Sequence, residues 1–545
     1  FDPGARPAPL AARRPVGGTT TGSVSGDGSL PNALEAEVYG YLPYWMLDAT
    51  SLSFLDYELL STIAYFGVPA QPNGTLQRTG VYWDGWTSTH MTNVINAAHA
   101  EGVEVVLTVT MMGWSGTTNM ATLLNNPTSR ATLAADIAAA VAERNADGVN
   151  LDFEPMPEAL QDSYTAFVRQ VRAALGPDAS LTVAVTGGSA SWGDGYDLPA
   201  LVGPDAAEAL MVMGYDYSWS GSARAGGVSP IDSPYILDVD TAMDDFLAAV
   251  PASKLIWGVP YYGRAWTTTG DTLNSETCAG ADTCDPASWA FRYTDALTSV
   301  GTHGRRWDPT GQIPWYAYES ATYDTWVQGY YDDAPSLDAK YDRIRAAGMR
   351  GVGIWHLLMD AGRWELWYEL TRNFSALAFN DIEESIFWRE ITWLAETGIT
   401  GGCGNGRFCP TAVVRRGEMA SFLVRALGLG PATADYFTDD ETSIHENDIN
   451  RLAEAGITVG CAAGRFCPTG TVRRDEMASF LVRGLGLPAA TDDPFTDDEG
   501  NVHESNINRL AEAGIAGGCS AARYCPAGLV SREQMAAFLY RALGP

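Results

Sequence analysis

The fold of this chain is decided by the stretch Asp147-Gly148-Val149-Asn150-Leu151-Asp152-Phe153-Glu154, in which polar and apolar side chains alternate. An alternation with a period of two is typical of a β-strand, which directs successive side chains to opposite faces. Asn150, Asp152 and Glu154 therefore share one face. Three polar side chains in a row are costly in a packed core, so we expect this face to line a solvent-filled cleft. Pro155 ends the strand, because proline has no N–H to donate to a neighbouring strand.

Similar strand-like runs lie on both sides of this stretch, within residues 35–375. Eight runs alternate with helical stretches, and they span 38–42, 62–68, 103–110, 149–154, 181–186, 209–215, 255–260 and 351–357. Regular alternation of eight strands with helices predicts the α/β class and a (β/α)8 TIM barrel. In such a barrel the chemistry lies where the strands end, and here these ends carry polar and aromatic residues.

An insertion separates the last two strands of the predicted barrel. The seventh and eighth runs are about 90 residues apart, which is too long for one strand–helix unit. We expect a small α+β subdomain at about residues 264–348, forming one wall of the cleft.

A sequence repeat fills the C-terminal part of the chain. A Phe-x-Asp motif begins at Phe379, Phe437 and Phe495, at a constant spacing of 58 residues. Each unit contains two helical stretches separated by a loop with two cysteines. A fixed period of this kind predicts an all-α domain of stacked copies that share a core. We name the copies repeat 1, repeat 2 and repeat 3, at residues 376–430, 431–488 and 489–545.

The eight cysteines form four close pairs with the same C-x5-C spacing: Cys278 and Cys284, Cys403 and Cys409, Cys461 and Cys467, Cys519 and Cys525. An even set with short spacings predicts disulfides formed in an oxidising compartment. Zinc is the competing interpretation, but the pairs lack the CxxC spacing and nearby histidines.

Composition excludes several classes of partner. The net charge of −32 argues against nucleic acid, whose binding requires clustered Lys and Arg. No apolar run approaches the roughly 20 residues of a spanning helix, so no membrane insertion is expected. Neither a cofactor nor a metal is predicted, although the acidic run 497–501 is a candidate calcium loop without the EF-hand spacing.

The N-terminal residues predict export from the cell. Residues 1–34 are rich in Pro, Gly, Ala, Thr and Ser, as expected of a flexible leader. The chain begins with Phe1, and we interpret it as the mature form of a secreted protein.

The pair Asp152 and Glu154 suits acid–base chemistry on a glycosidic bond. The two carboxyl groups approach closely on one strand face, so repulsion raises one pKa and lets Glu154 stay protonated near neutral pH. Two acids on a strand are also typical of a salt-bridged rim, so this pattern alone leaves both interpretations open.

The stretch 147–154 resembles the DxxDxDxE signature of family 18 glycoside hydrolases, the chitinase family. Further segments resemble the family's strands in the right order: Tyr39-Gly40-Tyr41, Met213-Gly214-Tyr215-Asp216, Gly258-Val259-Pro260-Tyr261-Tyr262-Gly263-Arg264 and Gly353-Ile354-Trp355. The resemblance covers about residues 36–375.

The resemblance implies substrate-assisted, retaining hydrolysis of β-1,4-linked N-acetylglucosamine polymers such as chitin. Glu154 would protonate the scissile oxygen, and Asp152 would orient the 2-acetamido group that attacks its own sugar ring. Tyr215 would bind the acetamido oxygen. We expect further substrate contacts from residues in these motifs and at the strand ends, namely Tyr41, Trp45, Trp114, Met213, Asp216, Arg264 and Trp355.

Asn150 departs from the family pattern, because many members have Asp at this position. Family members with Asn here include relatives directed at spore cortex and peptidoglycan. A peptidoglycan- or cortex-directed N-acetylglucosaminidase is therefore an alternative function. A non-catalytic carbohydrate-binding surface protein is another, but lectin-like relatives usually lack the terminal acid, and Glu154 is present.

The triple repeat resembles S-layer homology domains, which hold exoenzymes to cell-wall polymers. Arg416, Arg474 and Arg532 match the ligand-contacting Arg of those domains, and an anionic polymer suits their forked guanidinium groups. Capping of helices or pairing with local acids is the competing role. Trp388, a further candidate for polymer contact, is replaced by Glu in the other two repeats. These features predict retention of the secreted protein at a bacterial cell surface.

Overall fold

The computed structural model describes residues 34–279, 284–375, 379–382, 385–520 and 522–544, and the statements below concern these residues. They divide into two compact units, one ending at residue 375 and the other beginning at residue 379. Each unit is described by itself.

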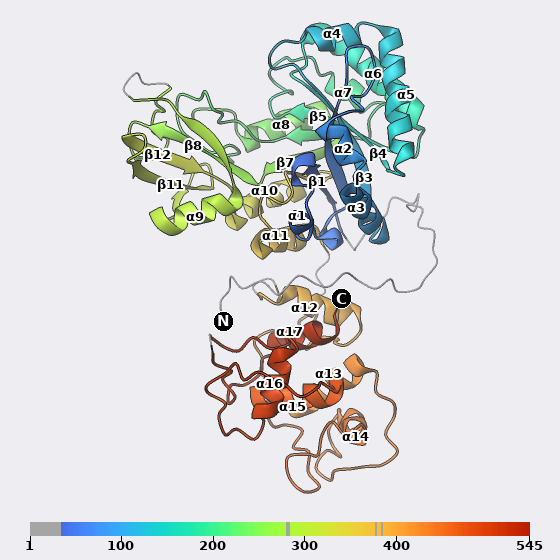
Figure 1. Ribbon diagram of the computed structural model, residues 1–545, viewed down its shortest axis with the longest axis vertical. Helices are drawn as coiled ribbons and strands as arrows, with labels where there is room; N and C mark the ends of the chain where they lie inside the picture. The colour runs from blue at the N-terminus through green and yellow to red at the C-terminus, as the bar shows by residue number, and fades with distance from the viewer. Residues whose placement is uncertain (1–33, 280–283, 376–378, 383–384, 521, 545) are drawn as a thin grey trace. The chain divides into compact units, whose positions relative to one another are not determined.

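The first unit is a closed barrel of parallel strands in the order β1-β13-β7-β6-β5-β4-β3-β2 (Figure 1). Its strands are β1 (Glu37–Pro43), β2 (Thr62–Pro69), β3 (Glu104–Met112), β4 (Gly148–Glu154), β5 (Ser180–Thr186), β6 (Ala209–Met213), β7 (Leu255–Pro260) and β13 (Gly351–Trp355). The predicted TIM barrel is confirmed, and each strand overlaps one of the eight runs identified in the sequence.

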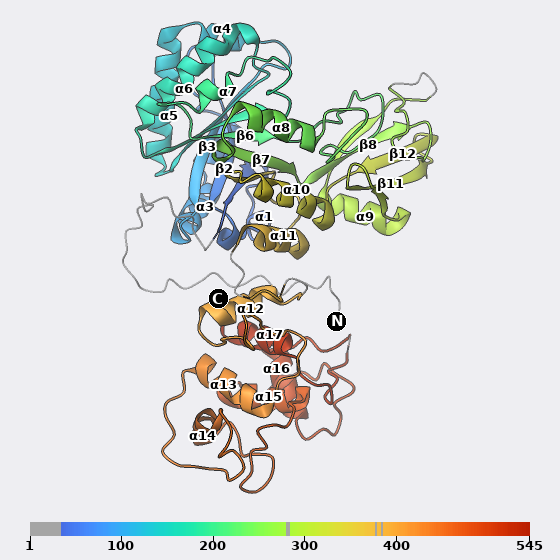
Figure 2. The same cartoon turned by 180° about the vertical axis from the view of Figure 1, so that it is seen from behind.

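Helices surround the barrel, as the view from behind also shows (Figure 2). The longer ones are α3 (Thr89–Ala100), α5 (Pro127–Glu143), α6 (Gln161–Leu175), α8 (Val239–Ala249), α10 (Ala334–Ala346) and α11 (Trp364–Phe374). Local chemistry sets where they begin. The Asn126 side chain accepts hydrogen bonds from the first backbone N–H groups of α5, and Pro127 occupies a first-turn position that requires no N–H donor.

The interior of the barrel is packed with side chains, which corrects one expectation from the sequence. Asn150 and Asp152 point inward but are 0% and 4% exposed, so they do not line a solvent-filled cleft. They lie beside a core that includes Tyr39, Tyr41 and Met211. Only Glu154, at the end of β4, reaches a partly exposed position. Closure of eight strands fills the lumen, and solvent meets it only at the ends.

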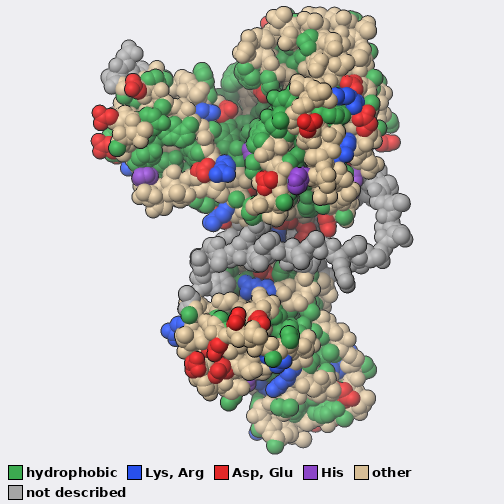
Figure 3. All heavy atoms as spheres, in the orientation of Figure 1, with side chains coloured by type: hydrophobic (Ala, Val, Ile, Leu, Met, Phe, Trp, Pro, Cys, Tyr) green, Lys and Arg blue, Asp and Glu red, His purple; other side chains and the backbone are tan. Residues whose placement is uncertain are grey.

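The insertion forms a five-stranded antiparallel sheet in the order β10-β11-β12-β8-β9. Its elements are β8 (Tyr262–Thr268), β9 (Ser288–Arg292), α9 (Tyr293–His303), β10 (Arg306–Asp308), β11 (Ile313–Ser320) and β12 (Thr325–Tyr330). Hydrophobic side chains gather over this sheet on the face shown in Figure 3. Helix α10, which we expected within the insertion, contacts β13 and α11 of the barrel instead.

The second unit contains three pairs of helices. Their bounds are α12 (Trp388–Glu396), α13 (Arg416–Leu427), α14 (Glu446–Glu454), α15 (Arg474–Leu485), α16 (Glu504–Glu512) and α17 (Arg532–Leu543). The contacting pairs are α13 with α14, α15 with α16, and α12 with α17. The pairing of the first helix with the last closes the three copies into a ring.

Backbone hydrogen bonds complete this ring at its centre. Val472 N donates to Val414 O (3.0 Å), Val530 N to Val472 O (3.0 Å) and Val414 N to Val530 O (2.9 Å). Each repeat thus bonds to both others, in contrast to an open stack, whose end copies each contact a single neighbour.

Candidate functional site

The carboxyl end of β4 holds the two acids predicted for catalysis. Asp152 is buried, and its Oδ1 atom has no hydrogen-bond partner among the described residues. Burial raises the pKa of Asp152 to about 7, because a charged carboxylate is poorly solvated there.

Glu154 has the properties of a general acid. Burial raises its pKa well above the usual range, and the negative charges of Asp152 and Asp216 add to the effect. Its backbone carbonyl accepts a hydrogen bond from Gly113 N (2.6 Å), which ties the end of β4 to the loop after β3. A carboxyl group that stays protonated at neutral pH can donate its proton to a leaving oxygen.

Asn150 takes part in a hydrogen-bond network inside the barrel. Its Nδ2 donates to the Tyr41 hydroxyl (3.0 Å), and its Oδ1 accepts from Thr182 Oγ1 (2.9 Å). The Tyr39 hydroxyl lies 3.2 Å from the same Thr182 oxygen. A neutral amide held in this way cannot exchange a proton with Asp152.

Two tyrosines bring hydroxyl groups toward the acids. The pKa of Tyr215 is raised by burial and by the charges of Glu154, Asp152 and Asp216. The pKa of Tyr41 is raised by burial and, among other causes, by Asp152 and Tyr215. Both hydroxyls therefore keep their protons and can act as hydrogen-bond donors.

Asp216 is held by Tyr262, for which the sequence predicted no role. The Tyr262 hydroxyl donates to Asp216 Oδ1 (2.5 Å), and the Tyr262 ring packs edge-on against Tyr215. Arg264 lies on the insertion sheet, where its Nη1 donates to Ser288 Oγ (3.4 Å) and its buried Nε has no partner among the residues that the structure describes. The motif from Gly258 to Arg264 thus connects the barrel to the insertion.

Aromatic and sulfur-containing side chains form an apolar surface beside the acids. The Trp355 ring centroid lies 5.2 Å from that of Tyr41 and 4.7 Å from that of Phe66. Met213 and Trp355 pack against the same core cluster. The structure therefore brings Tyr41, Met213 and Trp355 together, as expected for one pocket.

Exposed tryptophans follow several barrel strands. Trp45 and Trp114 are 50% and 67% exposed in the loops after β1 and β3. Trp192 and Trp219 are also exposed, after β5 and β6, and were not among the residues expected from the sequence. The sequence offered a signal for these two residues, because each is a tryptophan shortly after the end of a predicted strand. Exposed rings at this end of the barrel are suited to stacking on sugars.

The three arginines predicted to contact a wall polymer, Arg416, Arg474 and Arg532, are mostly buried between repeats. Each guanidinium Nε donates to a backbone carbonyl of another repeat: Arg416 to Phe466 (2.9 Å), Arg474 to Tyr524 (2.9 Å) and Arg532 to Phe408 (2.7 Å). Each also lies over the ring of the same partner residue. Their contacts hold the ring together, a role that the sequence did not suggest and that differs from helix capping.

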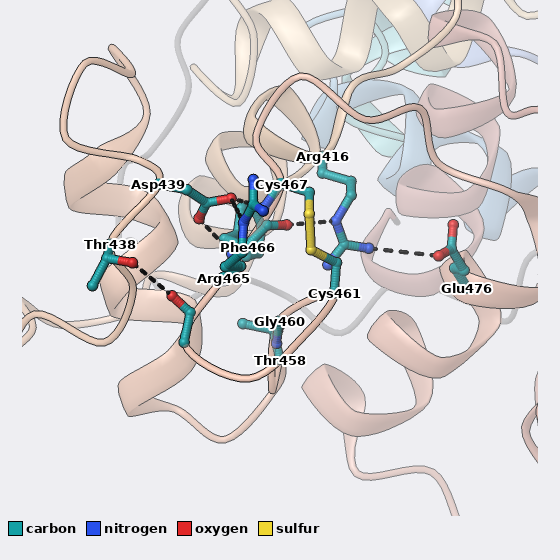
Figure 4. Close-up of a disulfide and its surroundings, with 11 residues drawn as sticks. Arg416, Thr438, Asp439, Thr458, Gly460, Cys461, Arg465, Phe466, Cys467 and Glu476 are labelled. Atoms are coloured by element: carbon teal, nitrogen blue, oxygen red, sulfur yellow. Dashed lines mark hydrogen bonds and ion pairs between the residues drawn. A yellow bond between two sulfur atoms is a disulfide. The ribbon is translucent and has the colours of Figure 1, made fainter.

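Disulfides hold the loops that receive these arginines. All four predicted pairs are bonded. Figure 4 shows the pair Cys461–Cys467, with Phe466 accepting from Arg416 and with Glu476 on the other side of the guanidinium group (3.6 Å). Each arginine thus docks on the residue that precedes the second cysteine of the next repeat.

Trp388 differs from the expectation of a polymer contact. Its side chain is only 7% exposed, because it packs inside the second unit at the start of α12.

None of the described helices combines the length and apolar character that crossing a membrane requires.

Comparisons with known proteins agree with this geometry. The sequence model of Glycosyl hydrolases family 18 matches residues 37–360, and that of the S-layer homology domain matches residues 378–420. A Bacillus subtilis (strain 168) protein named as a sporulation-specific glycosylase, YdhD, is 28% identical over 62% of this chain and 80% of its own. Chitinase A1 of Niallia circulans is 25% identical over 54% of this chain and 47% of its own.

Solved structures share the fold of the first unit. A chitinase from Cycas revoluta in complex with (GlcNAc)3 has a TM-score of 0.54 at 19% identity, covering 62% of this chain and 99% of that one. The family match spans more than half of the sequence and includes every barrel strand. The chain therefore belongs to family 18 of the glycosyl hydrolases, and an S-layer homology domain follows its catalytic domain.

Proposed function

We propose that this enzyme hydrolyses β-1,4 linkages of N-acetylglucosamine polymers, with chitin as the main substrate, by a substrate-assisted retaining mechanism. The observation that carries the proposal is the acid pair at the end of β4. Glu154 has a raised pKa and partial exposure, while Asp152 is buried beside it with an oxygen that has no partner within the described part of the chain.

In the first step, the Glu154 carboxyl group gives its proton to the glycosidic oxygen as the bond from that oxygen to the anomeric carbon breaks. The 2-acetamido carbonyl oxygen of the same sugar forms a bond to the anomeric carbon, giving an oxazolinium ion. Asp152 stabilises the acetamido N–H. In the second step, water attacks the anomeric carbon as the bond from that carbon to the acetamido oxygen breaks, and the water gives a proton to the Glu154 carboxylate, which restores the acid.

The surrounding side chains would hold the acetamido sugar. Tyr215, whose hydroxyl keeps its proton, would donate to the acetamido oxygen. Met213 and Trp355 would form the apolar surface under the ring. Asp216, held by Tyr262, would bind a sugar hydroxyl. This arrangement selects sugars that carry an N-acetyl group, because the nucleophile belongs to the substrate.

Analysis of products tests the proposal. We expect the enzyme to release shorter chitooligosaccharides from chitohexaose, with the β-anomer formed first, as measured by mass spectrometry and by NMR immediately after cleavage. Initial release of the α-anomer would contradict retention, and absence of any cleavage would contradict the proposed function.

A peptidoglycan- or cortex-directed glucosaminidase is the second candidate. Asn150 favours it, as does the similarity to a protein named as a sporulation-specific glycosylase. Faster release of products from purified sacculi than from chitin would favour this candidate over the first.

The second unit supports attachment at the cell surface, since the S-layer homology domain implies binding to the cell wall. We propose an anionic wall polymer as its ligand, with the strongest site at Arg474. Glu476 lies 3.6 Å from Arg416, and Glu418 lies 4.0 Å from Arg532. By the spacing of the repeats, the counterpart of Glu476 at the Arg474 site is the neutral Gln534, 58 positions later. The Arg474 charge is therefore more available to an anion.

The substitution Gln534→Glu tests this difference between the three sites. We expect about tenfold weaker binding to purified cell-wall polymer in a sedimentation assay, because the new carboxylate competes for a charged hydrogen bond of roughly 1.5 kcal/mol. The helix cap survives, since Glu418 and Glu476 make the same cap in their own repeats. The matched variant Glu476→Gln should strengthen binding, and unchanged affinity in both variants would contradict the proposed site.

A further inference from the structure

Two aspartates of the second unit are buried without hydrogen-bond partners. Asp440 in repeat 2 and Asp498 in repeat 3 are each 1% exposed. Neither oxygen of either carboxylate has a hydrogen-bond partner on another of the described residues. Burial of an unpaired carboxylate is costly, so such groups usually bind a cation or stay protonated.

Three further carboxylates act electrostatically on each of these aspartates. Burial raises the pKa of Asp440, and the negative charges of Asp435, Glu446 and Asp439 add to the effect. Asp493, Glu504 and Asp497 act on Asp498 in the same way. Repulsion of this kind favours a bound cation, which would neutralise several acids at once.

The neighbouring aspartates Asp439 and Asp497 have a different role. Asp439 accepts hydrogen bonds from the backbone of Phe466 (2.7 Å) and Cys467 (3.0 Å) and from Arg465 (3.3 Å). Asp497 makes the same set of contacts in repeat 3. Their charges are therefore compensated by the protein, whereas the charges of Asp440 and Asp498 are not.

Repeat 1 lacks all three acidic positions together. The counterparts of Asp435, Asp440 and Glu446, 58 residues earlier, are Leu377, Ile382 and Trp388. Position 377 lies outside the described residues, while Ile382 and Trp388 are buried apolar side chains. Concerted replacement of three acids by apolar residues, at an equivalent place in the same fold, is expected if the acids serve one shared ligand.

The loops that carry these acids are already folded. Ser443 N donates to Asp440 O (2.7 Å), and Asn501 N donates to Asp498 O (2.8 Å), so both loops turn in the same way. In repeat 3, Gly500 N also donates to Glu504 Oε2 (2.7 Å), which draws that carboxylate to the loop.

We propose that repeats 2 and 3 each bind one calcium ion, at Asp440 with Glu446 and at Asp498 with Glu504, and that repeat 1 binds none. Calcium is the ion best suited to this donor set, because it takes carboxylate and carbonyl oxygens in flexible geometry. The disulfides indicate an oxidising compartment outside the cytoplasm, where calcium reaches millimolar levels and sites of about 0.1–1 mM affinity are common.

Calorimetric titration of the chelator-treated full chain with calcium chloride tests the proposal. We expect two sites in the unmodified protein, one in Asp440→Asn, one in Asp498→Asn and none in the double variant. Calcium should also raise the unfolding temperature of the second unit, and the double variant should lose this shift. Magnesium should not replace calcium, because it requires a near-ideal octahedron.

The exposed acids Glu441 and Glu499 provide matched controls, because each lies next to one of these aspartates. Glu441→Gln and Glu499→Gln remove the same charge and should keep both sites. If an Asn variant fails to fold, Glu446→Gln and Glu504→Gln test the same sites from α14 and α16. Absence of binding to the unmodified protein would mean that the buried carboxyls are protonated, and unchanged stoichiometry in the variants would mean that calcium binds elsewhere. Either result would overturn the proposal.

Discussion

Replacement of Glu154 by glutamine is expected to reduce hydrolysis of chitohexaose by roughly 10²–10⁴-fold, the usual contribution of a general acid. Glutamine has the shape of glutamic acid but no acidic proton for the leaving oxygen. The loss should appear in kcat rather than in substrate affinity, because the sugar-binding side chains are unchanged. Initial rates and a binding isotherm on the same oligosaccharide measure the two effects separately.

The control for this variant is Glu158→Gln, an exposed acid four residues further along the chain. Its activity should match that of the unmodified enzyme. Substantial turnover by Glu154→Gln, with the fold intact by circular dichroism, would exclude Glu154 as the proton donor. The raised pKa of Glu154 also predicts that activity persists through neutral pH and falls only as the pH rises past that pKa.

Replacement of Asp152 by asparagine is expected to abolish most activity while stabilising the fold at neutral and alkaline pH. The catalytic loss follows from the missing charge beside the acetamido N–H, and roughly 10²–10³-fold is typical for removal of one such group. The gain in stability, about 1–3 kcal/mol, follows from removal of a buried carboxylate with an unpartnered oxygen.

The gain should depend on pH in a defined direction. The folded-state pKa of Asp152 is about 7, above the roughly 3.9 of an unfolded aspartate. Between these values the folded protein binds more protons than the unfolded chain, so its stability falls as the pH rises. Chemical denaturation at several pH values should therefore show no benefit of the substitution near pH 3 and the full benefit above pH 7.

The contrasting variant is Asp147→Asn at the other end of β4. Asp147 Oδ2 accepts hydrogen bonds from Val105 N (2.6 Å) and lies 2.8 Å from His99 Nε2. Its loss should destabilise the fold by about 1 kcal/mol. If both substitutions destabilised the fold, the Asp152 carboxylate would not be the destabilising buried group that we infer.

Most of the barrel could be predicted from the sequence. The eight apolar runs became eight parallel strands, because period and length are local properties that closure of the barrel does not change. The spacing of Cys461 and Cys467, repeated in each copy, likewise predicted the disulfides. The C-terminal boundary of the insertion was less predictable. No change in the sequence pattern marks the start of α10, yet this helix packs on the barrel.

The sites were predicted unevenly. Alternation along β4 identified Asp152 and Glu154, but it suggested a solvent-filled face where the structure has a packed one. The hydrogen bonds of Asn150 to Tyr41 and Thr182 join residues 109 and 32 positions apart, and no local pattern reports such contacts. The contact between Tyr262 and Asp216 is another that no local pattern reports, because it forms where two different strands end at the same place.

By itself, the sequence determined which elements form, which acids share a strand face and which positions repeat every 58 residues. Only the tertiary structure decided that Asp152 is buried without a full set of partners, and that the arginines hold the three repeats in a ring. It also separated Asp439, whose charge is compensated, from its neighbour Asp440, whose charge is not. The physical reason is that burial and hydrogen bonding depend on what other segments bring to a residue, and the strand end around Glu154 acquires its chemistry from that environment.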